Sequence, residues 1–335
     1  MKAAIRHLHP SGEGDPGAYR STLAMLLKAL GDPLRLQIVR LLKEDSLSVS
    51  ELCDVFEARQ SALSHHLKVL VDAGVLVRRR EGTAGFYRRG LASGAHKMLL
   101  EALFNSVDCE ALGAAVNHGL MRVQQQREQN SLAFFRHNSL RFREQQDLIA
   151  SWDDYAQATL HLLDYCEHSP SLAVLEIGAG DGRLLPLLAT RAQQVTALDN
   201  APEMLAAARS TAGHLPNVEF CLGDTTALAT RPERFGAVVI NMVLHHTPNP
   251  HAVIKHAAAS LVPGGALLIS ELVAHDQAWA REHCGDLWLG FEPEQITRWG
   301  RQAGLENHAE LFITQRNGFQ IQVRLLTRTI GKKGH

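Results

Sequence analysis

The stretch that decides the fold of most of the chain is Val174-Leu175-Glu176-Ile177-Gly178-Ala179-Gly180-Asp181-Gly182-Arg183. It is an apolar run followed by a glycine-rich turn, and the next residues, starting at Arg183, have a helical pattern. In a doubly wound sheet, ligands bind beyond the carboxyl ends of the strands near such a turn, where glycines let the backbone approach the ligand. The glycines are spaced Gly-x-Gly-x-Gly rather than Gly-x-Gly-x-x-Gly, which favours a nucleoside without phosphates over pyrophosphate-bound NAD.

Outward from this turn, short apolar runs alternate with helix-length intervals. The runs are VLEIG, VTALD, VEFCLGD, FGAVVIN and GALLISE. This alternation predicts a parallel sheet in a Rossmann-like, doubly wound α/β domain. Asp199 ends the second run, where a carboxylate accepts hydrogen bonds from both hydroxyls of a ribose, and Asp224 follows the third run.

Five elements in this order resemble the class I S-adenosylmethionine-dependent methyltransferases. They are residues 176–182, Leu198-Asp199, Gly223-Asp224, residues 241–246 and residues 261–265. The resemblance implies S-adenosylmethionine as cofactor, with S-adenosylhomocysteine as product or ligand. It places Glu176, Gly178 and Gly180 at the methionine part, Asp199 at the ribose and Asp224 at the adenine amine. The full set of implied cofactor residues is Glu176, Gly178, Ala179, Gly180, Asp199, Asn200, Asp224, Thr225 and Asn241.

Candidate catalytic residues follow the fourth run. Methyl transfer mainly needs an aligned donor and nucleophile, and a base is required only when the nucleophile is protonated. His245 and His246 lie where this fold usually places its substrate mouth, so either is a candidate base; they are equally interpretable as cofactor-pocket or helix-start residues. The segment 286–291 covers the substrate pocket or belongs to the core. The 18 histidines form no spaced cluster typical of a metal site, so no metal is expected.

The N-terminal part of the chain has a net positive charge, whereas the rest has a net negative charge. Residues 1–95 contain 14 Lys and Arg against 10 Asp and Glu, a net charge of +4, whereas the remainder has a net charge of -5. Seven basic and two acidic residues lie between Arg59 and Arg89. A local basic excess suits a polyanion such as DNA, although a solvated charged surface has the same composition.

The pattern of this part predicts a winged helix-turn-helix. Asp32-Pro33 begins a helix, and Ser48 with Glu51 forms a capping box for the next one. A helix over residues 60–72 buries Leu63, Leu67 and Leu70, and a basic hairpin follows. The candidate DNA-contacting residues are Arg59, Gln60, Ser61, Ser64, His65, Lys68, Arg78, Arg79, Arg80 and Arg88.

Residues 29–42, 48–52 and 59–88 resemble the ArsR/SmtB-type winged-helix repressors. The resemblance implies a double-stranded DNA operator and a homodimer paired through its first and last helices. Many members release DNA on binding metal, but the positions of the thiolate ligands look like Ser48 and Ser50 here. The zinc-type site on the last helix is also missing, since its nearest candidate begins at Asp108 and lacks the later ligands.

Five cysteines, at 53, 109, 166, 221 and 284, form no Cys-x-x-Cys pair. Neither a disulfide framework nor a thiolate zinc site is indicated, and a reducing cytoplasm is expected. Cys53 and Cys109 are expected to be ordinary buried cysteines rather than thiol switches. The other three do not reproduce the arrangement of arsenic methyltransferases.

The 335 residues, 45% of them hydrophobic, suit about two domains. We expect a flexible tail over 1–20, an ArsR-type winged helix over 21–95, a helical linker or dimerisation segment over 96–144, and a methyltransferase domain over 145–335. Within the linker segment, residues 96 to about 130 are expected to form a single helix. No apolar stretch approaches a membrane span, and the N-terminus is too polar for a signal peptide.

The favoured interpretation is a cytoplasmic, dimeric DNA-binding regulator whose C-terminal domain senses S-adenosylmethionine and/or methylates a small molecule. The alternative is a small-molecule methyltransferase that uses the winged helix for autoregulation or dimerisation. Methylation of DNA is disfavoured, because Asn241 is followed by Met-Val-Leu rather than by Pro-Pro-Tyr or Pro-Pro-Phe.

Overall fold

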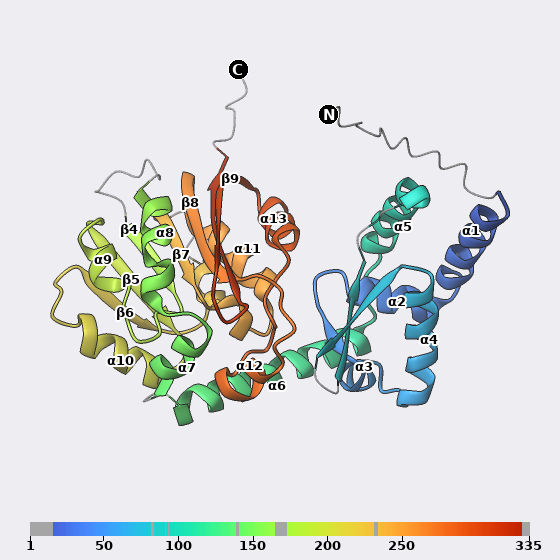
Figure 1. Cartoon of the computed structure of the whole chain (residues 1–335), viewed down its shortest axis with the longest axis horizontal. Coiled ribbons are helices and arrows are strands. Elements are labelled where there is room, and N and C mark those ends of the chain that lie inside the picture. Colours follow the sequence, from blue (N-terminus) through green and yellow to red (C-terminus); the bar gives the residue numbers. More distant parts are fainter. Residues whose placement is uncertain are drawn as a thin grey trace, which may run out of the picture. The chain divides into compact units, whose positions relative to one another are not determined.

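The structure is a computed structural model that describes residues 16–81, 84–90, 92, 94–138, 141–164, 173–230 and 234–329. It divides into two compact units, an N-terminal unit of residues 1–121 and a C-terminal unit of residues 122–335 (Figure 1). The expected tail lies mostly outside the described residues. Its last residues, expected to be irregular, belong instead to the first helix, which begins at Pro16.

Among its described residues, the N-terminal unit contains five complete α-helices, one 3-10 helix, the start of a sixth α-helix and a small sheet. These are α1 (Pro16–Leu30), α2 (Pro33–Leu41), β1 (Leu47–Ser48), α3 (Val49–Phe56), α4 (Gln60–Asp72), β2 (Leu76–Glu81), β3 (Ala84–Arg89), the 3-10 helix η1 (Gly94–His96), α5 (Lys97–Cys109) and the start of α6 (Ala114–Asn138). The sheet order is β1-β3-β2, and both pairs are antiparallel. The helix-turn-helix and the hairpin of a winged helix are therefore present.

Local sequence signals set the helix starts in this unit. The Asp32 side chain accepts the main-chain N–H of Arg35 at 2.9 Å, and Pro33 occupies the first turn of α2. At α3, the Ser48 hydroxyl accepts the N–H of Glu51 at 3.2 Å, and the Glu51 carboxylate accepts the N–H of Ser48 at 2.8 Å. The predicted capping box is confirmed, and it satisfies two donors that the first helical turn leaves unpaired.

The prediction of a single helix over residues 96–130 is wrong. The structure has two helices, because α5 ends at Cys109 and α6 starts at Ala114. Glu110 is extended, with φ -82° and ψ 139°, and Gly113 precedes the new helix. The apolar spacing continues across this break, so the periodicity did not reveal it.

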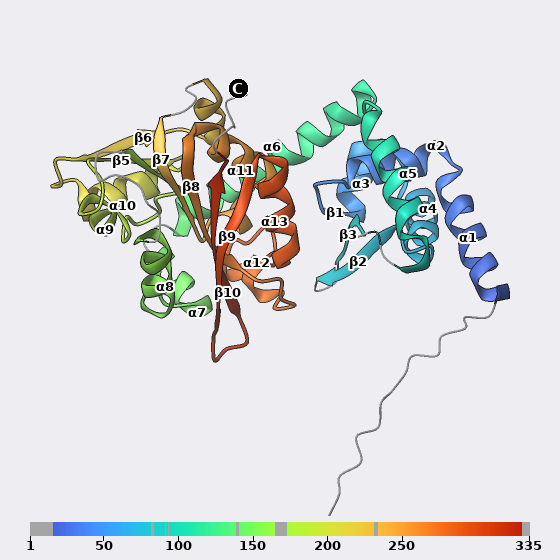
Figure 2. The ribbon, with the colours of Figure 1, turned by 90° about the horizontal axis from the view of Figure 1, so that it is seen from above.

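The C-terminal unit is a seven-stranded sheet between helices (Figure 2). Its elements are α7 (Phe142–Ile149), α8 (Trp152–Asp164), β4 (Ala173–Ile177), α9 (Leu185–Ala189), β5 (Gln194–Asp199), α10 (Pro202–Ala212), β6 (Val218–Leu222), η3 (Thr225–Thr230), β7 (Phe235–Asn241), η4 (Leu244–His246), α11 (Pro250–Ser260), β8 (Leu261–Leu272), α12 (Trp279–Cys284), α13 (Pro293–Gln302), β9 (Leu305–Thr314) and β10 (Gln320–Arg328). The strand order is β6-β5-β4-β7-β8-β10-β9.

The five predicted runs are the five parallel strands β4 to β8. Strands β9 and β10 were not predicted; β10 pairs antiparallel with both β8 and β9. Buried apolar residues form one cluster on the side of α8, α9 and α10 and another on the side of α11 and α13. Both faces of the sheet are therefore covered, as a parallel sheet requires.

Candidate functional site

The candidate site is a cavity in the C-terminal unit beyond the carboxyl ends of β4, β5 and β7. The turn after β4 forms one wall, and α6 and α7 form another. Its lining includes Glu128, Ser131, Phe135, Phe142, Gln146, Tyr155, Glu176, Gly178, Ala179, Gly180, Asp199, Asn200, Asn241 and His246. This is the edge at which ligands bind in open α/β sheets.

The turn after β4 depends on glycine. Gly178 and Gly180 have φ of +70° and +54°, which side chains rarely adopt. A Cβ at Gly178 would lie 2.5 Å from the Val243 side chain, so a larger residue would displace the cavity wall. The Gly180 N–H donates to Asp199 at 3.1 Å and thereby ties this turn to the end of β5.

Asp199 is held by main-chain donors at the end of β5. Besides the Gly180 N–H, it accepts the Ala201 N–H at 2.9 Å. Burial raises the pKa of Asp199 to about 6, although the surrounding N–H groups act to lower it. A carboxylate has about four acceptor positions, so further donors in the cavity can bind to it.

Two further acceptors in the cavity wall are buried and lack a hydrogen-bond partner among the described residues. They are Oε2 of Glu176 and Oδ1 of Asn241. Burial, with the negative charges of Asp181 and Asp199, raises the pKa of Glu176 well above its usual value. The cavity therefore presents acceptors to a ligand rich in donors or positive charge. The ammonium and ribose hydroxyls of S-adenosylmethionine are such donors, so these residues fit that cofactor.

Seven of the nine sequence-predicted cofactor residues line the cavity, and two do not. Asp224 and Thr225 follow β6 outside this lining. The exposed Asp224 carboxylate accepts the Thr226 N–H at 2.7 Å, and the Thr225 hydroxyl lies 3.0 Å from Nδ1 of His256. Their roles in binding the adenine remain predictions.

The structure separates the two candidate bases. His246 lines the cavity, and its ring stands edge-on to Phe135 with centroids 5.0 Å apart. Its Nε2 lies 3.3 Å from Nε2 of Gln146 and its Nδ1 lies 3.3 Å from the Gly285 oxygen. Burial, then the neighbouring charge of His245, lowers the pKa of His246 well below its usual value, so the imidazole is neutral at pH 7.

His245 does not line the cavity and is fully buried. Its Nδ1 lies 2.6 Å from Oε1 of Glu271, as an ion pair inside the unit. Burial acts to lower the pKa of His245, but Glu271 and Asp286 together raise it to about 9. Of the two histidines, only His246 lines this cavity.

Several lining residues were not found from the sequence. Ser131 and Phe135 come from α6, Phe142 and Gln146 from α7, and Tyr155 from α8. These helices precede the sheet, and their amphipathic patterns carry no signal for a ligand site. The segment 286–291, left open between pocket cover and core, is core: Trp288 and Phe291 pack in the cluster beside α11 and α13.

Some cysteine predictions are corrected. Cys109, expected to be buried, is exposed, and Cys53 is half-buried. Cys109 is the last residue of α5, next to the break that the single-helix prediction missed, which explains the exposure. Cys284 is buried and Cys221 is exposed, whereas Cys166 lies outside the described residues.

The predicted DNA-contacting residues gather on one side of the helix-turn-helix and on the hairpin. Arg59, Gln60, Ser61, Ser64, His65, Lys68, Arg78 and Arg80 are exposed, and Arg79 and Arg88 are half-buried. Leu63, Leu67 and Leu70 are buried on the other side of α4. Lys68 donates to Asp72 at 2.7 Å, one turn further on. This is the arrangement of a recognition helix with a basic wing.

The position that corresponds to the first zinc-type ligand is already engaged. Asp108 accepts two hydrogen bonds from Arg89, at 2.7 and 3.0 Å, and forms an ion pair with Lys43 at 3.2 Å. Although burial opposes it, these cations lower the pKa of Asp108. Asp108 thus joins α5 to the wing and to the end of α2.

Family models match both parts of the chain. The model described as "Bacterial regulatory protein, arsR family" matches residues 32–77, and the model described as "Methyltransferase domain" matches residues 174–265. The ubiquinone biosynthesis O-methyltransferase of Xanthomonas campestris pv. campestris is 31% identical over 179 residues, which cover 46% of this chain and 75% of the relative. That of Idiomarina loihiensis is 33% identical over 129 residues, covering 36% of this chain and 51% of the relative.

Solved structures are similar to this chain at lower sequence identity than these relatives. A Burkholderia thailandensis 1,6-didemethyltoxoflavin-N1-methyltransferase aligns with TM-score 0.49 and 20% identity, covering 62% of this chain and 90% of its own. The N-methyltransferase NodS of Bradyrhizobium japonicum aligns with TM-score 0.44 and 19% identity, covering 56% of this chain and 97% of its own.

Among the described residues, no helix has the length and apolar character of a membrane span. The chain belongs to the class I S-adenosylmethionine-dependent methyltransferases and carries an ArsR-family winged-helix domain ahead of its methyltransferase domain.

Proposed function

We propose that this protein is a homodimeric DNA-binding regulator in which S-adenosylmethionine, bound in the cavity, changes the affinity for an operator. The observation that carries the proposal is the course of α6. This helix starts at Ala114 in the N-terminal unit and ends at Asn138 in the C-terminal unit. Its last turns contribute Ser131 and Phe135 to the cavity wall.

The first turns of α6 are firmly packed in the N-terminal unit. A Cβ at Gly119 would lie 2.5 Å from the main-chain oxygen of Val55, so glycine permits a close approach to α3. The first turns of α6 thus contact α3, and its last turns line the cavity. A ligand shifts the DNA-binding equilibrium only if it binds the DNA-competent and DNA-incompetent arrangements of the protein with different affinities. A helix with residues in both units would provide a physical link for such a difference.

The cofactor would be held by acceptors that the cavity already presents. Asp199 would accept the ribose hydroxyls, and Glu176 and Asn241 would accept donors of the methionine part. When bound, S-adenosylmethionine supplies an electrophilic methyl group. The chain's own contribution is to orient the donor and acceptor and, for a protonated nucleophile, to accept a proton at Nε2 of His246.

The contacts of His246 support that role. The Gln146 amide is a donor to Nε2 of His246, so the Nε2 lone pair points to the side of this cavity-lining residue. The ring proton then lies on Nδ1, which faces the Gly285 oxygen at 3.3 Å. A small molecule with an O–H or N–H nucleophile is the acceptor class that this geometry suits.

The dimer would form through α1 and α5. Large apolar side chains are exposed on both helices: Met25 and Leu27 are 49% and 52% exposed, and Met98 and Leu99 are 84% and 37% exposed. A second copy of this chain that brings the same two helices would cover these side chains. Removal of apolar side chains from water favours such an association.

Calorimetric titration of the full chain with S-adenosylmethionine tests the cofactor site. Asp199→Ala should weaken binding by about 1.5–3 kcal/mol, or roughly 10- to 150-fold, because the ribose loses a charged acceptor. Asp276→Ala, at an exposed carboxylate outside the cavity lining, is the matched control and should bind like the parent. Equal affinities for all three proteins would refute the proposed site.

A further inference from the structure

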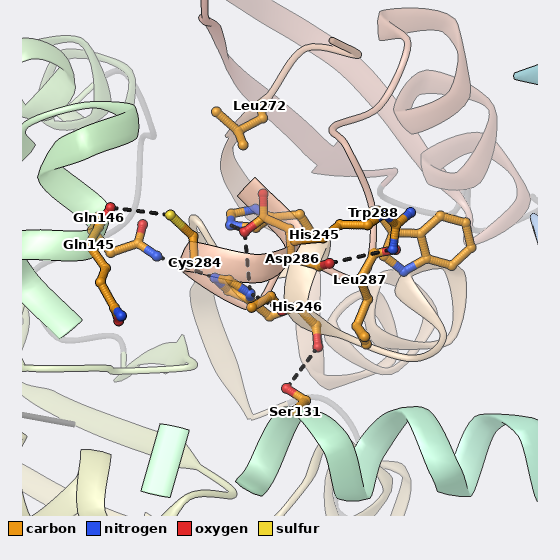
Figure 3. A network of polar contacts seen from close by, with 12 residues as sticks. Ser131, Gln145, Gln146, His245, His246, Leu272, Cys284, Asp286, Leu287 and Trp288 are labelled. Carbon is orange, nitrogen blue, oxygen red and sulfur yellow. Dashed lines mark hydrogen bonds and ion pairs between the residues drawn. The ribbon is translucent and has the colours of Figure 1, made fainter. Parts of the chain in front are cut away.

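A second set of ligand-type groups lies behind His246, away from its Nε2. One ring nitrogen of His245, one ring nitrogen of His246 and one carboxylate oxygen of Asp286 all lie within 4.8 Å of one another. Asp286 Oδ1 is 4.0 Å from Nε2 of His245 and 3.9 Å from Nδ1 of His246. Figure 3 shows these three residues, which come from η4 and from the loop after α12, gathered in one place.

These groups are buried and incompletely satisfied. His245 is 0% exposed and Asp286 is 2% exposed. Nε2 of His245 and both carboxylate oxygens of Asp286 lack a hydrogen-bond partner among the described residues. Buried polar groups without partners are costly, and those of a native protein call for an explanation such as an ion or a ligand.

Two buried acidic side chains flank the His245 ring. Nδ1 of His245 lies 2.6 Å from Glu271, and its Nε2 lies 4.0 Å from Asp286. A divalent cation would bind both the unpartnered oxygens of Asp286 and the unpartnered nitrogen of His245.

The surroundings of His245 resemble those of a metal ligand. Its Nδ1 lies 2.6 Å from Glu271, which is itself fixed by the main-chain N–H groups of His245 at 3.2 Å and Leu272 at 2.6 Å. Metal-binding histidines commonly donate their second ring N–H to a carboxylate, which fixes the tautomer and orients the ring. Glu271 thereby directs the other nitrogen of His245 toward Asp286.

From these contacts we propose that His245, His246 and Asp286 form a binding site for a divalent first-row transition metal ion. Two imidazoles and one carboxylate are a donor set that Zn2+ and Fe2+ accept. Ligand atoms about 2.0–2.1 Å from a tetrahedral Zn2+ lie about 3.3 Å apart. The separations of 3.9 and 4.0 Å are about 0.6–0.7 Å longer than this value, so metal binding would draw the three side chains closer together.

The metal would change what His246 presents to the cavity. Coordination through Nδ1 leaves the ring proton on Nε2, so His246 becomes a donor toward the cavity and cannot act there as a base. This consequence rests on the proton-accepting role proposed above, whereas the metal site does not. Metal occupancy would therefore inhibit turnover without displacing the cofactor.

Direct binding measurements test the site independently of methyl transfer. The chelator-treated full chain is titrated with Zn2+ by calorimetry, and Co2+ absorption reports the coordination geometry. We expect one high-affinity Zn2+ per chain, lost in Asp286→Asn and in His245→Gln. Glu271→Gln should weaken affinity by roughly 10- to 100-fold, as removal of an outer-shell partner does. His283→Gln, at an exposed histidine on α12, is the control for binding at the surface and should leave the high-affinity site intact.

Thermal unfolding separates loss of ligands from loss of fold. The metal-free Asp286→Asn variant should melt at or above the temperature of the metal-free parent, because it removes a buried, unsatisfied carboxylate. Zn2+ should raise the melting temperature of the parent and of His283→Gln but not of Asp286→Asn. Absence of high-affinity binding in the parent, or equal Zn2+ affinity in the parent and Asp286→Asn, would overturn the proposal.

Discussion

Ser131 on α6 donates a hydrogen bond to the main-chain oxygen of His246 at 3.2 Å, across 115 residues of sequence. The bond joins the helix that continues into the N-terminal unit to the wall of the cavity. This buried contact holds the Ser131 segment of α6 against the cavity wall. Energetic coupling between distant sites in a protein is carried by packed side chains and hydrogen bonds.

Removing this bond should weaken the link between cofactor and DNA. We expect Ser131→Ala to bind S-adenosylmethionine within about twofold of the parent, while the cofactor's effect on DNA affinity falls by about 0.5–2 kcal/mol. The measurement is the ratio of operator affinities with and without cofactor. Ser210→Ala is the control, since it loses a similar hydroxyl bond on α10, to Ala206, away from the cavity. An unchanged ratio in Ser131→Ala would exclude this contact from the link.

Cofactor affinity should depend on the ionisation of Asp199. Its pKa of about 6 is above the ordinary aspartate value, so its charge is lost as the pH falls through 6. Only the ionised carboxylate is a charged acceptor for the ribose. The affinity for S-adenosylmethionine should therefore fall by about tenfold between pH 7 and pH 5. Because the cofactor selects the ionised form, its binding near pH 6 should release a proton. Calorimetry in buffers of different ionisation enthalpy measures both effects. In Asp199→Asn the dependence near pH 6 should vanish, and its persistence there would assign it to another group.

The wing should supply phosphate contacts. Arg80 is exposed on β2, and its replacement should weaken binding to every DNA sequence alike. For one lost phosphate contact, the slope of log affinity against log salt should become shallower by about 0.9. Fluorescence anisotropy over a salt series measures this slope for Arg80→Ala. Arg301→Ala, at an exposed residue of α13, should keep the parental slope. The same slope in both variants would argue against the wing assignment.

The exposed apolar side chains of α1 and α5 should be buried in a dimer. Met98→Glu would place a charge in that interface, and we expect the variant to sediment as a monomer at concentrations where the parent is dimeric. Met121 is also exposed, at 68%, but it lies on α6, so Met121→Glu should leave the dimer intact. A dimeric Met98→Glu would show that another surface forms the interface.

Turnover with a protonated acceptor should need His246. Loss of a general base typically costs about 10²- to 10⁴-fold in rate. In a screen that detects S-adenosylhomocysteine formed with metabolite extracts, His246→Gln should retain cofactor binding and lose turnover to this extent. His283→Gln removes an exposed histidine on α12, outside the cavity lining, and should cost far less. Equal losses in the two variants would show that His246 has no special role.

Local signals explain why much of the fold was predictable. The caps at Asp32 and Ser48 act within a few residues, so they are visible in any short window of sequence. Of the five parallel strands, β4, β5, β7 and β8 are mostly buried and are therefore continuous apolar runs, whereas β6 lies at the edge of the sheet and is more exposed. The turn from Gly178 to Gly180 was recognisable because its positive φ angles select glycine.

Features that depend on tertiary contacts were missed. Strand β10 contains buried Gln322 and Arg324, which interrupt its apolar run. Gln322 donates to the Phe291 oxygen at 2.8 Å and accepts from Arg324 at 2.7 Å, and neither contact is visible from sequence spacing. The proximity of Asp286 to His245 was not predictable either, because it depends on how the loop after α12 folds.

The most direct test of the account is the affinity of the full chain for DNA from its own upstream region, measured by fluorescence anisotropy at one stated salt concentration. It is measured with and without S-adenosylmethionine or S-adenosylhomocysteine, on the parent and on Asp199→Ala. We expect at least one of these ligands to change the DNA affinity of the parent. At ligand concentrations that saturate only the parent, this change should be absent in Asp199→Ala. Specific DNA binding that neither ligand alters, in a parent that binds the cofactor, would contradict it.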